Sequence, residues 1–258
     1  MYRLNTLLLT FISGMIFIES SLAAISLPSN TINTENSVIS LKIAATTKSP
    51  YFTEKNDGFL NLLLAEVGKR LNIEFDILTA MPPERALSKL NQGAIDGDFP
   101  RVSGLEKIYP SIISVPEKIV DFQFVAFSYE QCISPISFEL MQKSKVGLVI
   151  GWKIYEERTM NFDDLTTIVK SSQLFNLLSR KRIQYALHEH YIGNKFIADL
   201  KLKNKIYECT PPLMVKPMYL YLNKKHHNLI PILSDTLKKI KADGTYQLIA
   251  EKTLQTNR

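Results

Sequence analysis

The sequence is poor in the residues that mark several protein classes. Its 258 residues include only 2 cysteines, 4 histidines and 1 tryptophan, together with 10 glycines and 12 prolines. So few glycines and prolines exclude a collagen-like chain, and two cysteines exclude both a cysteine-rich scaffold and a four-cysteine zinc site. Hydrophobic residues nevertheless make up 45% of the chain, which excludes a disordered protein and is enough for a sizeable core.

Long runs of one charge are also missing. The formal net charge is +6, but basic and acidic residues are interleaved, and the basic runs at 180–182 and 238–239 are short. We therefore predict no nucleic-acid partner. The modest positive balance either favours an anionic ligand or serves solubility.

An apolar run lies at the N-terminus, and no later stretch is long and apolar enough for a membrane helix. Arg3 precedes the apolar residues 7–18, and small residues follow them. About a dozen apolar residues are too few to span a bilayer, whereas the small residues suit a signal peptidase. We predict a signal peptide over residues 1–24, cleaved after Ala23 or Ala24, and a soluble mature protein in the periplasm. An uncleaved anchor is the alternative.

The first folded segment alternates strands and helices. It follows a flexible leader over residues 25–39, which is rich in Ser, Asn and Thr. Strands are expected over residues 41–45 and 72–78, and a helix between them is indicated by apolar side chains on one face, at Leu60, Leu63, Leu64, Val67 and Leu71. A second helix is expected from Pro82 to Gly93, and a third strand over residues 94–99.

This alternation predicts a mostly parallel sheet, with a ligand crevice at the carboxyl ends of its strands. The loop over residues 48–52, expected to be exposed, and Arg101, directly after the third strand, fall at those ends. Of the adjacent aromatics Tyr51 and Phe52, we expect one to face the crevice.

A second segment repeats this outline after a long strand over residues 119–128. It opens with a buried strand over residues 145–150 and the turn Gly151-Trp152-Lys153. The remaining elements expected are a helix from Tyr155, a helix over 172–178, a strand over 183–187 with a polar tip at 188–191, a strand over 217–222 and a final helix over 231–244. Two such units, each a mostly parallel sheet flanked by helices and joined by two crossover strands, predict a two-lobed α/β protein with a cleft.

Four short sequence motifs follow one another along most of the mature chain. They are Pro50-Tyr51-Phe52 with Gly58-Phe59, Gly93-Ala94-Ile95-Asp96, Lys145-Val146-Gly147 up to Gly151, and Ile240-Lys241-Ala242-Asp243-Gly244-Thr245. Their order and spacing resemble the family 3 extracellular solute-binding proteins of amino-acid ABC transporters, which have the type II periplasmic binding protein fold. The segment 99–107 resembles a divergent proteobacterial branch of that family.

The resemblance implies a monomeric, non-catalytic protein without a cofactor. Such a protein closes its lobes about a hinge around a small solute and presents it to an ABC permease in the inner membrane. In the family, an aromatic packs on the ligand, a glycine turn supplies backbone donors and an acid binds the ammonium; here these match Tyr51 or Phe52, Gly151-Trp152-Lys153, and Glu189. Trp152 itself belongs either to the cleft or to the core, and Lys153 either adds charge or is solvated.

The contact to a carboxylate is either Arg101 or Lys107. Lys107 occupies the nominal position of the family's arginine, whereas Arg101 lies closer to the strand tip. A guanidinium there would hold a carboxylate through two parallel hydrogen bonds. The alternative for Arg101 is a structural pair with Asp98 or Glu106.

No metal site and no catalytic residue is predicted. Glu189 lies between His188 and His190, which an extended backbone would place on one face. The zinc-protease motif fails, because Ile192 stands where its second histidine belongs. The rival hypotheses are a periplasmic enzyme of dehydratase type, with Glu84, Glu189 or His190 as acid or base, and an orphan sensor without its own permease.

The two cysteines fall together in the predicted lobe 2. We expect lobe 1 to comprise residues 40–125 and 217–258, and lobe 2 residues 126–216. If the two crossover strands lie antiparallel side by side, Cys132 follows the first and Cys209 precedes the second. In an oxidising compartment we expect them to form a disulfide that leaves lobe closure free, with two free thiols as the alternative.

Overall fold

The computed structural model describes residues 38–79 and 81–254. The predicted signal peptide and residues 25–37 of the predicted leader lie outside these residues. The strands are β1 (Ile39–Ala45), β2 (Ile73–Leu78), β3 (Gly97–Val102), β4 (Ile112–Ser114), β5 (Val120–Ser128), β6 (Lys145–Val149), β7 (Asp164–Ile168), β8 (Tyr185–Glu189), β9 (Tyr207–Glu208) and β10 (Met214–Asn223). The helices are α1 (Phe59–Leu71), α2 (Pro83–Asn91), α3 (Phe138–Met141), α4 (Lys153–Arg158), α5 (Ser171–Ser179), α6 (His190–Asp199), α7 (Leu229–Ala242) and α8 (Thr245–Thr253), with short 3₁₀ helices η1 (Leu105–Lys107) and η2 (Lys224–His226). Among the described residues, no helix combines the length and the apolar character needed to cross a membrane.

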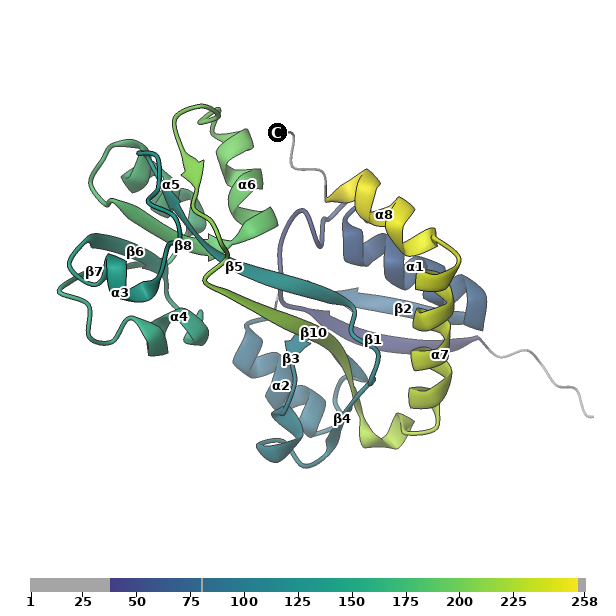
Figure 1. The fold of residues 1–258 in the computed structure, drawn as a ribbon. Helices are drawn as coiled ribbons and strands as arrows, with labels where there is room; N and C mark the ends of the chain where they lie inside the picture. Colours follow the sequence, from purple (N-terminus) through teal and green to yellow (C-terminus); the bar gives the residue numbers. More distant parts are fainter. Residues whose placement is uncertain (1–37, 80, 255–258) are drawn as a thin grey trace, which may run out of the picture. The chain divides into compact units, whose positions relative to one another are not determined.

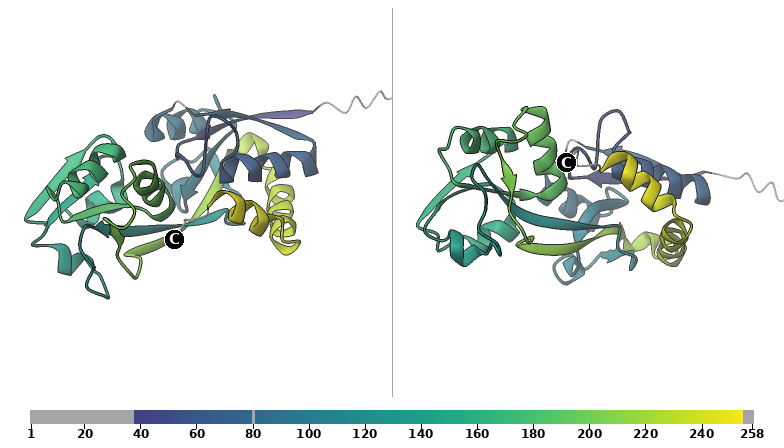
Figure 2. Two further views of the ribbon diagram at one scale, coloured as in Figure 1. Left: turned by 90° about the horizontal axis from the view of Figure 1, so that it is seen from above. Right: turned by 45° about the horizontal axis from the view of Figure 1, so that its top comes forward.

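The strands form one sheet with a parallel part at each end (Figure 1). Strands β2, β1 and β3 run parallel at one end, and β8, β6 and β7 run parallel at the other. Strands β5 and β10 lie between them as an antiparallel pair. We call β1–β3 with α1, α2, α7 and α8 the first half, and β6–β8 with α3–α6 the second half (Figure 2). This arrangement confirms the predicted α/β class and the two crossover strands.

Helix α1 follows the predicted periodicity. Its inward face buries Leu60, Leu63, Leu64 and Val67. The helix ends at Asn72, whose left-handed backbone (φ 54°) turns the chain directly into β2. Gly68 permits this close return, because a Cβ at that position would lie 2.4 Å from the carbonyl oxygen of Ile73.

Strand β3 starts further along the chain than predicted. The backbone of Asp96 still belongs to the preceding turn, where its N–H donates to the carbonyl of Lys42 at 2.9 Å. Antiparallel pairing with β10 then extends the strand, with Tyr219 opposite Arg101 and Met218 opposite Val102. Arg101 therefore lies within β3, and the expectation that it follows the strand is wrong.

The C-terminal segment contains two helices where one was expected. Helix α7 ends before Gly244, which has a φ of 84°. This left-handed conformation interrupts the helix at low cost only for glycine. Helix α8 then packs beside α1 of the first half (Figure 1).

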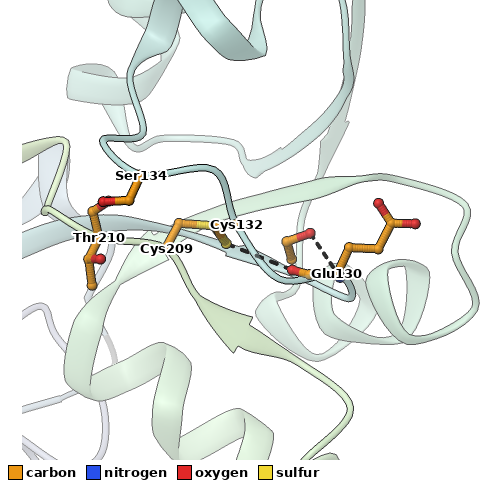
Figure 3. The surroundings of a disulfide bond; sticks show 6 residues. Glu130, Cys132, Ser134, Cys209 and Thr210 are labelled. Atoms are coloured by element: carbon orange, nitrogen blue, oxygen red, sulfur yellow. Dashed lines mark hydrogen bonds between the residues drawn. A yellow bond between two sulfur atoms is a disulfide. The ribbon is translucent and has the colours of Figure 1, made fainter.

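The predicted disulfide between Cys132 and Cys209 is present (Figure 3). Cys132 lies in the loop after β5, and Cys209 follows β9 and precedes β10. Their Cα atoms are 5.4 Å apart, and the N–H of Cys209 donates to the carbonyl of Ala126 in β5 at 2.8 Å. The antiparallel β5–β10 pair brings the two cysteines together, as expected from the sequence.

Candidate functional site

A cleft of about 880 Å³ lies between the first and second halves. The first half contributes the loop after β1, the start of α2 and the end of β3, and the second half contributes the starts of α4 and α5 and part of α6. Its lining includes Thr46, Thr47, Lys48, Glu84, Leu87, Arg101, Tyr109, Gly151, Trp152, Lys153, Glu157, Lys170, Ser171, Ser172, His188, Ile192 and Phe196. Phe122 and Phe124 of β5 and Met218 of β10 complete it, so the two crossover strands form part of its wall.

Aromatic and apolar side chains cover the buried wall of the cleft. Phe122, Phe124 and Met218 are each 5% exposed or less. Trp152 packs edge-on against Phe124, with ring centroids 5.9 Å apart, and lies 5.0 Å from His188. The sequence left Trp152 either in the cleft or in the core. The structure places it in the cleft lining, where it also packs against the core.

Arg101 reaches the cleft but is bound to Asp98. Its Nε and Nη2 donate to one carboxylate oxygen of Asp98 at 2.8 and 2.6 Å, and Nη2 also donates to the carbonyl of Pro83 at 2.9 Å. Asp98 is fully buried, and its other oxygen has no hydrogen-bond donor among the described residues. Burial raises the pKa of Asp98, and Arg101 opposes that rise. The structural pair considered from the sequence is therefore present, while Lys107 is exposed and lies outside the cleft lining.

The glycine turn of the second half lies on the cleft, but its first backbone donor is occupied. The N–H of Gly151 donates to a carboxylate oxygen of Glu156 at 2.7 Å. Lys153 is largely exposed and pairs with the same carboxylate at 3.2 Å. Of the backbone donors expected from this turn, the N–H of Gly151 is therefore already bound by an acid five residues further along.

Tyr51 and Phe52 are both buried, so the expectation of an exposed loop is wrong for its two aromatic side chains, while Lys48 is exposed. Tyr51 is 0% exposed and Phe52 is 4% exposed, and neither belongs to the cleft lining. The ring of Tyr51 packs on Phe122 with centroids 4.7 Å apart, and its hydroxyl donates to Glu189 at 2.9 Å. These long-range contacts, which local sequence does not encode, draw the loop inward.

Glu189 ends β8 and begins α6, so the backbone from His188 to His190 is not continuously extended as considered above. Its carboxylate accepts from the Tyr51 hydroxyl and from the N–H of Ile192, both at 2.9 Å. It is 0% exposed and lies outside the cleft lining. Burial raises the pKa of Glu189 to about 7. The structure thus brings Arg101, Gly151, Trp152 and Lys153 to the cleft, but not Tyr51, Phe52 or Glu189.

His188 and Ser171 form a cleft pair that sequence reasoning missed. The backbone N–H of Glu189 donates to Nδ1 of His188 at 2.9 Å, so the proton of the neutral imidazole is on Nε2. Burial lowers the pKa of His188 to about 4 and keeps the ring neutral near pH 7. Nε2 lies 2.9 Å from Oγ of Ser171 and donates to it, which leaves the serine hydroxyl hydrogen as a donor. The signal in the sequence was a serine pair opening a helix.

Opposing pH dependences are expected from His188 and Glu189. Between pH 4 and 6.5 the unfolded chain is protonated at His188, whereas the folded protein is not. The stability contributed by this group therefore increases as pH rises from about 4 to 6.5. The folded protein keeps a proton on Glu189 that the unfolded chain loses, so stability from that group is complete below pH 4.5 and is lost as pH rises to about 7. Each contribution is about 3 kcal/mol, and the two cancel over their shared range.

Glu189→Gln should therefore make the protein less stable as pH falls from 6.5 to 4.5, because only the His188 contribution remains. His188→Gln should show the opposite slope. Urea denaturation of both variants and the original protein across this range measures the slopes. Three parallel profiles would contradict the burial effects assigned to the two side chains.

Comparison with known proteins identifies the fold. No protein-family model matches the chain. An uncharacterized protein from Shewanella oneidensis is 21% identical over 260 residues, covering 96% of this chain and 94% of that protein. An ancestral arginine-binding protein bound to arginine superposes with a TM-score of 0.67 at 17% identity, covering 84% of this chain and 98% of that one. The chain has the type II periplasmic binding protein fold.

Two further solved structures share this type II fold. The amino-acid ABC transporter substrate-binding protein AbpA from Streptococcus pneumoniae, bound to L-arginine, has a TM-score of 0.65 at 13% identity and covers 84% of this chain and 95% of that one. A histidine kinase sensor domain with similarity to periplasmic binding proteins has a TM-score of 0.68 at 16% identity, covering 83% and 96%. At such identities the likeness establishes the fold alone.

Proposed function

We propose that this protein is a periplasmic, non-catalytic solute-binding protein. It captures a small carboxylate-bearing solute, an amino acid or a related compound, and presents it to an ABC permease in the inner membrane. The observation that carries this proposal is the cleft of about 880 Å³ lined from both halves, with β5 and β10 in its wall. A solute that touches both halves favours their closed arrangement, which a permease can distinguish from the open one.

Two further observations support the proposal. Similar structures hold arginine, a small solute with a carboxylate. The disulfide fits an oxidising compartment such as the periplasm. In this proposal the protein is a monomer. Lobe 1, residues 40–125 with 217–258, and lobe 2, residues 126–216, close about the hinge.

An orphan sensor is the second candidate. The likeness to a histidine kinase sensor domain favours it, because the same fold there belongs to a signalling protein. A sensor would bind its solute without a permease partner. Solute uptake by cells with and without the gene separates the two roles.

The experiment for the proposed function is a thermal-shift screen of the exported form, residues 25–258. Amino acids, organic acids, sugars, polyamines and metal ions are added separately, and a bound solute is recovered for mass spectrometry. A solute at a hundred times its Kd should raise Tm by about 5–10 °C, because it binds only the folded protein. Recovery of the solute unchanged agrees with a binding protein, whereas recovery as a product would establish the enzyme alternative.

A further inference from the structure

Apart from Arg101, the charged side chains of the cleft lie at its rim, and most of its interior is apolar. Lys48, Glu84, Lys153, Glu157 and Lys170 are exposed. Behind them lie Phe122, Phe124, Met218, Leu87 and Ile192, each 7% exposed or less. A solute that enters fully therefore transfers much of its surface from water to apolar and aromatic side chains, which favours an apolar group of substantial size.

The residues that the structure describes place no carboxylate in this interior. Within residues 38–79 and 81–254, the acids of the cleft lining are the exposed Glu84 and Glu157. The two buried acids nearby are outside the lining: Asp98 is bound by Arg101, and Glu189 is bound by Tyr51 and the N–H of Ile192. An ammonium group drawn inside would lose its hydration without gaining a buried counter-charge, which is costly.

Hydrogen-bond donors are present in the interior, where the described lining has no buried carboxylate. The Ser171 hydroxyl accepts from His188, so its own hydrogen is available to an acceptor in the cleft. Arg101, with 13% of its side chain exposed, also belongs to the lining. The interior therefore favours an acceptor such as a carboxylate and disfavours a cation.

We propose that the cleft selects an organic carboxylate that carries an aromatic or branched aliphatic group and no ammonium group. This inference rests on the proposed function and narrows its solute class from amino acids to their deaminated relatives. The apolar group packs on Phe122, Phe124 and Trp152, and the carboxylate accepts from Ser171.

Two pairs of compounds test this selectivity, each differing in the ammonium group alone. They are 3-phenylpropanoate against L-phenylalanine, and 4-methylpentanoate against L-leucine. Trp152 is the single tryptophan of the sequence and lies on the cleft, so its fluorescence reports occupancy. With the exported full chain, one of the two carboxylates is expected to bind with a Kd at least tenfold below that of its amino acid.

A serine variant tests the donor. Ser171→Ala should raise the Kd of the bound carboxylate about tenfold, because a hydrogen bond to a charged acceptor is lost. Ser179→Ala removes a hydroxyl at the other end of α5, where it donates to the carbonyl of Asn176, and should leave the Kd unchanged. An unchanged Kd in Ser171→Ala would contradict the role assigned to this serine.

The remaining outcomes separate this inference from the proposed function. An amino acid that binds as tightly as its deaminated partner overturns the inference and agrees with the proposed function. Binding of none of the four compounds, together with a solute from another class in the thermal-shift screen, also overturns only the inference. A screen without any bound solute overturns the proposed function.

Discussion

Replacing Cys132 and Cys209 together with serine is expected to lower the free energy of unfolding by about 2–5 kcal/mol. The bond links residues 77 positions apart, and the loop that it closes contains β6 to β9. Without the bond the unfolded chain gains conformational freedom, while the folded contacts around it remain. Urea denaturation of the double variant and of the oxidised protein measures the difference.

The effect should be on stability and not on solute binding. Cys132 follows the end of β5 and Cys209 precedes the start of β10, both beside the second half, and neither belongs to the cleft lining. The reduced protein is expected to unfold at the same urea concentration as the double cysteine variant. Ser134→Ala, a control in the same loop, is expected to unfold at the same urea concentration as the oxidised protein. Equal migration of reduced and untreated protein, with two titratable thiols after unfolding, would show that the bond is absent.

Arg101→Ala is expected to lower the free energy of unfolding by about 3–5 kcal/mol. The substitution leaves the fully buried carboxylate of Asp98 without the ion partner that now donates to it at 2.6 and 2.8 Å. Burial then raises the pKa of Asp98 further, because the guanidinium no longer opposes the rise, so the variant should lose stability as pH rises through that pKa. Urea denaturation at several pH values measures both effects.

Two controls make this result specific. Lys118→Ala breaks the exposed pair with Asp121 and should cost less than about 1 kcal/mol. Asp98→Asn added to Arg101→Ala removes the uncompensated charge and should restore part of the lost stability. Equal losses of unfolding free energy in Arg101→Ala and Lys118→Ala would show that the buried pair stabilises the protein no more than the exposed pair does.

The variant that combines Arg101→Ala with Asp98→Asn also decides whether Arg101 contacts the solute. Arg101→Ala alone confounds lost binding with lost stability, because the arginine supports Asp98. A carboxylate that binds the folded double variant at full strength would exclude Arg101 as the anion contact. A loss of binding there, with folding intact, would assign that role to it.

Elements with local signals were predictable, and elements created by pairing were not. Helices α1 and α2 follow from apolar spacing and from proline and glycine at their ends. Strand β3 shifted because its antiparallel partner β10, more than a hundred residues away, extends it through Arg101. Short elements such as β4, β7 and β9 were not identified individually, since their residues carry weak patterns of their own.

The cleft was located correctly, while the partners of its side chains were not all foreseen. Gly151, Trp152 and Lys153 were placed by a strand followed by a glycine turn, which is a local pattern. Phe122 and Phe124 were visible as alternate residues of a crossover strand, but nothing in the sequence shows that their face lines the cleft. The burial of Tyr51 and Glu189 depends on a contact across 138 positions.

By itself the sequence determined the alternation of strands and helices, hence the two parallel halves, and the pairing of two cysteines beside the crossover strands. These follow from local hydrophobic spacing and from the order of elements along the chain. Only the tertiary structure decided which polar groups face the cleft. Asp98 is bound by Arg101 of the same strand, Glu189 is bound by Tyr51 from 138 positions away, and the Ser171 hydroxyl on the cleft accepts from His188. Such satisfaction of buried polar groups depends on three-dimensional contacts that spacing along the chain does not encode.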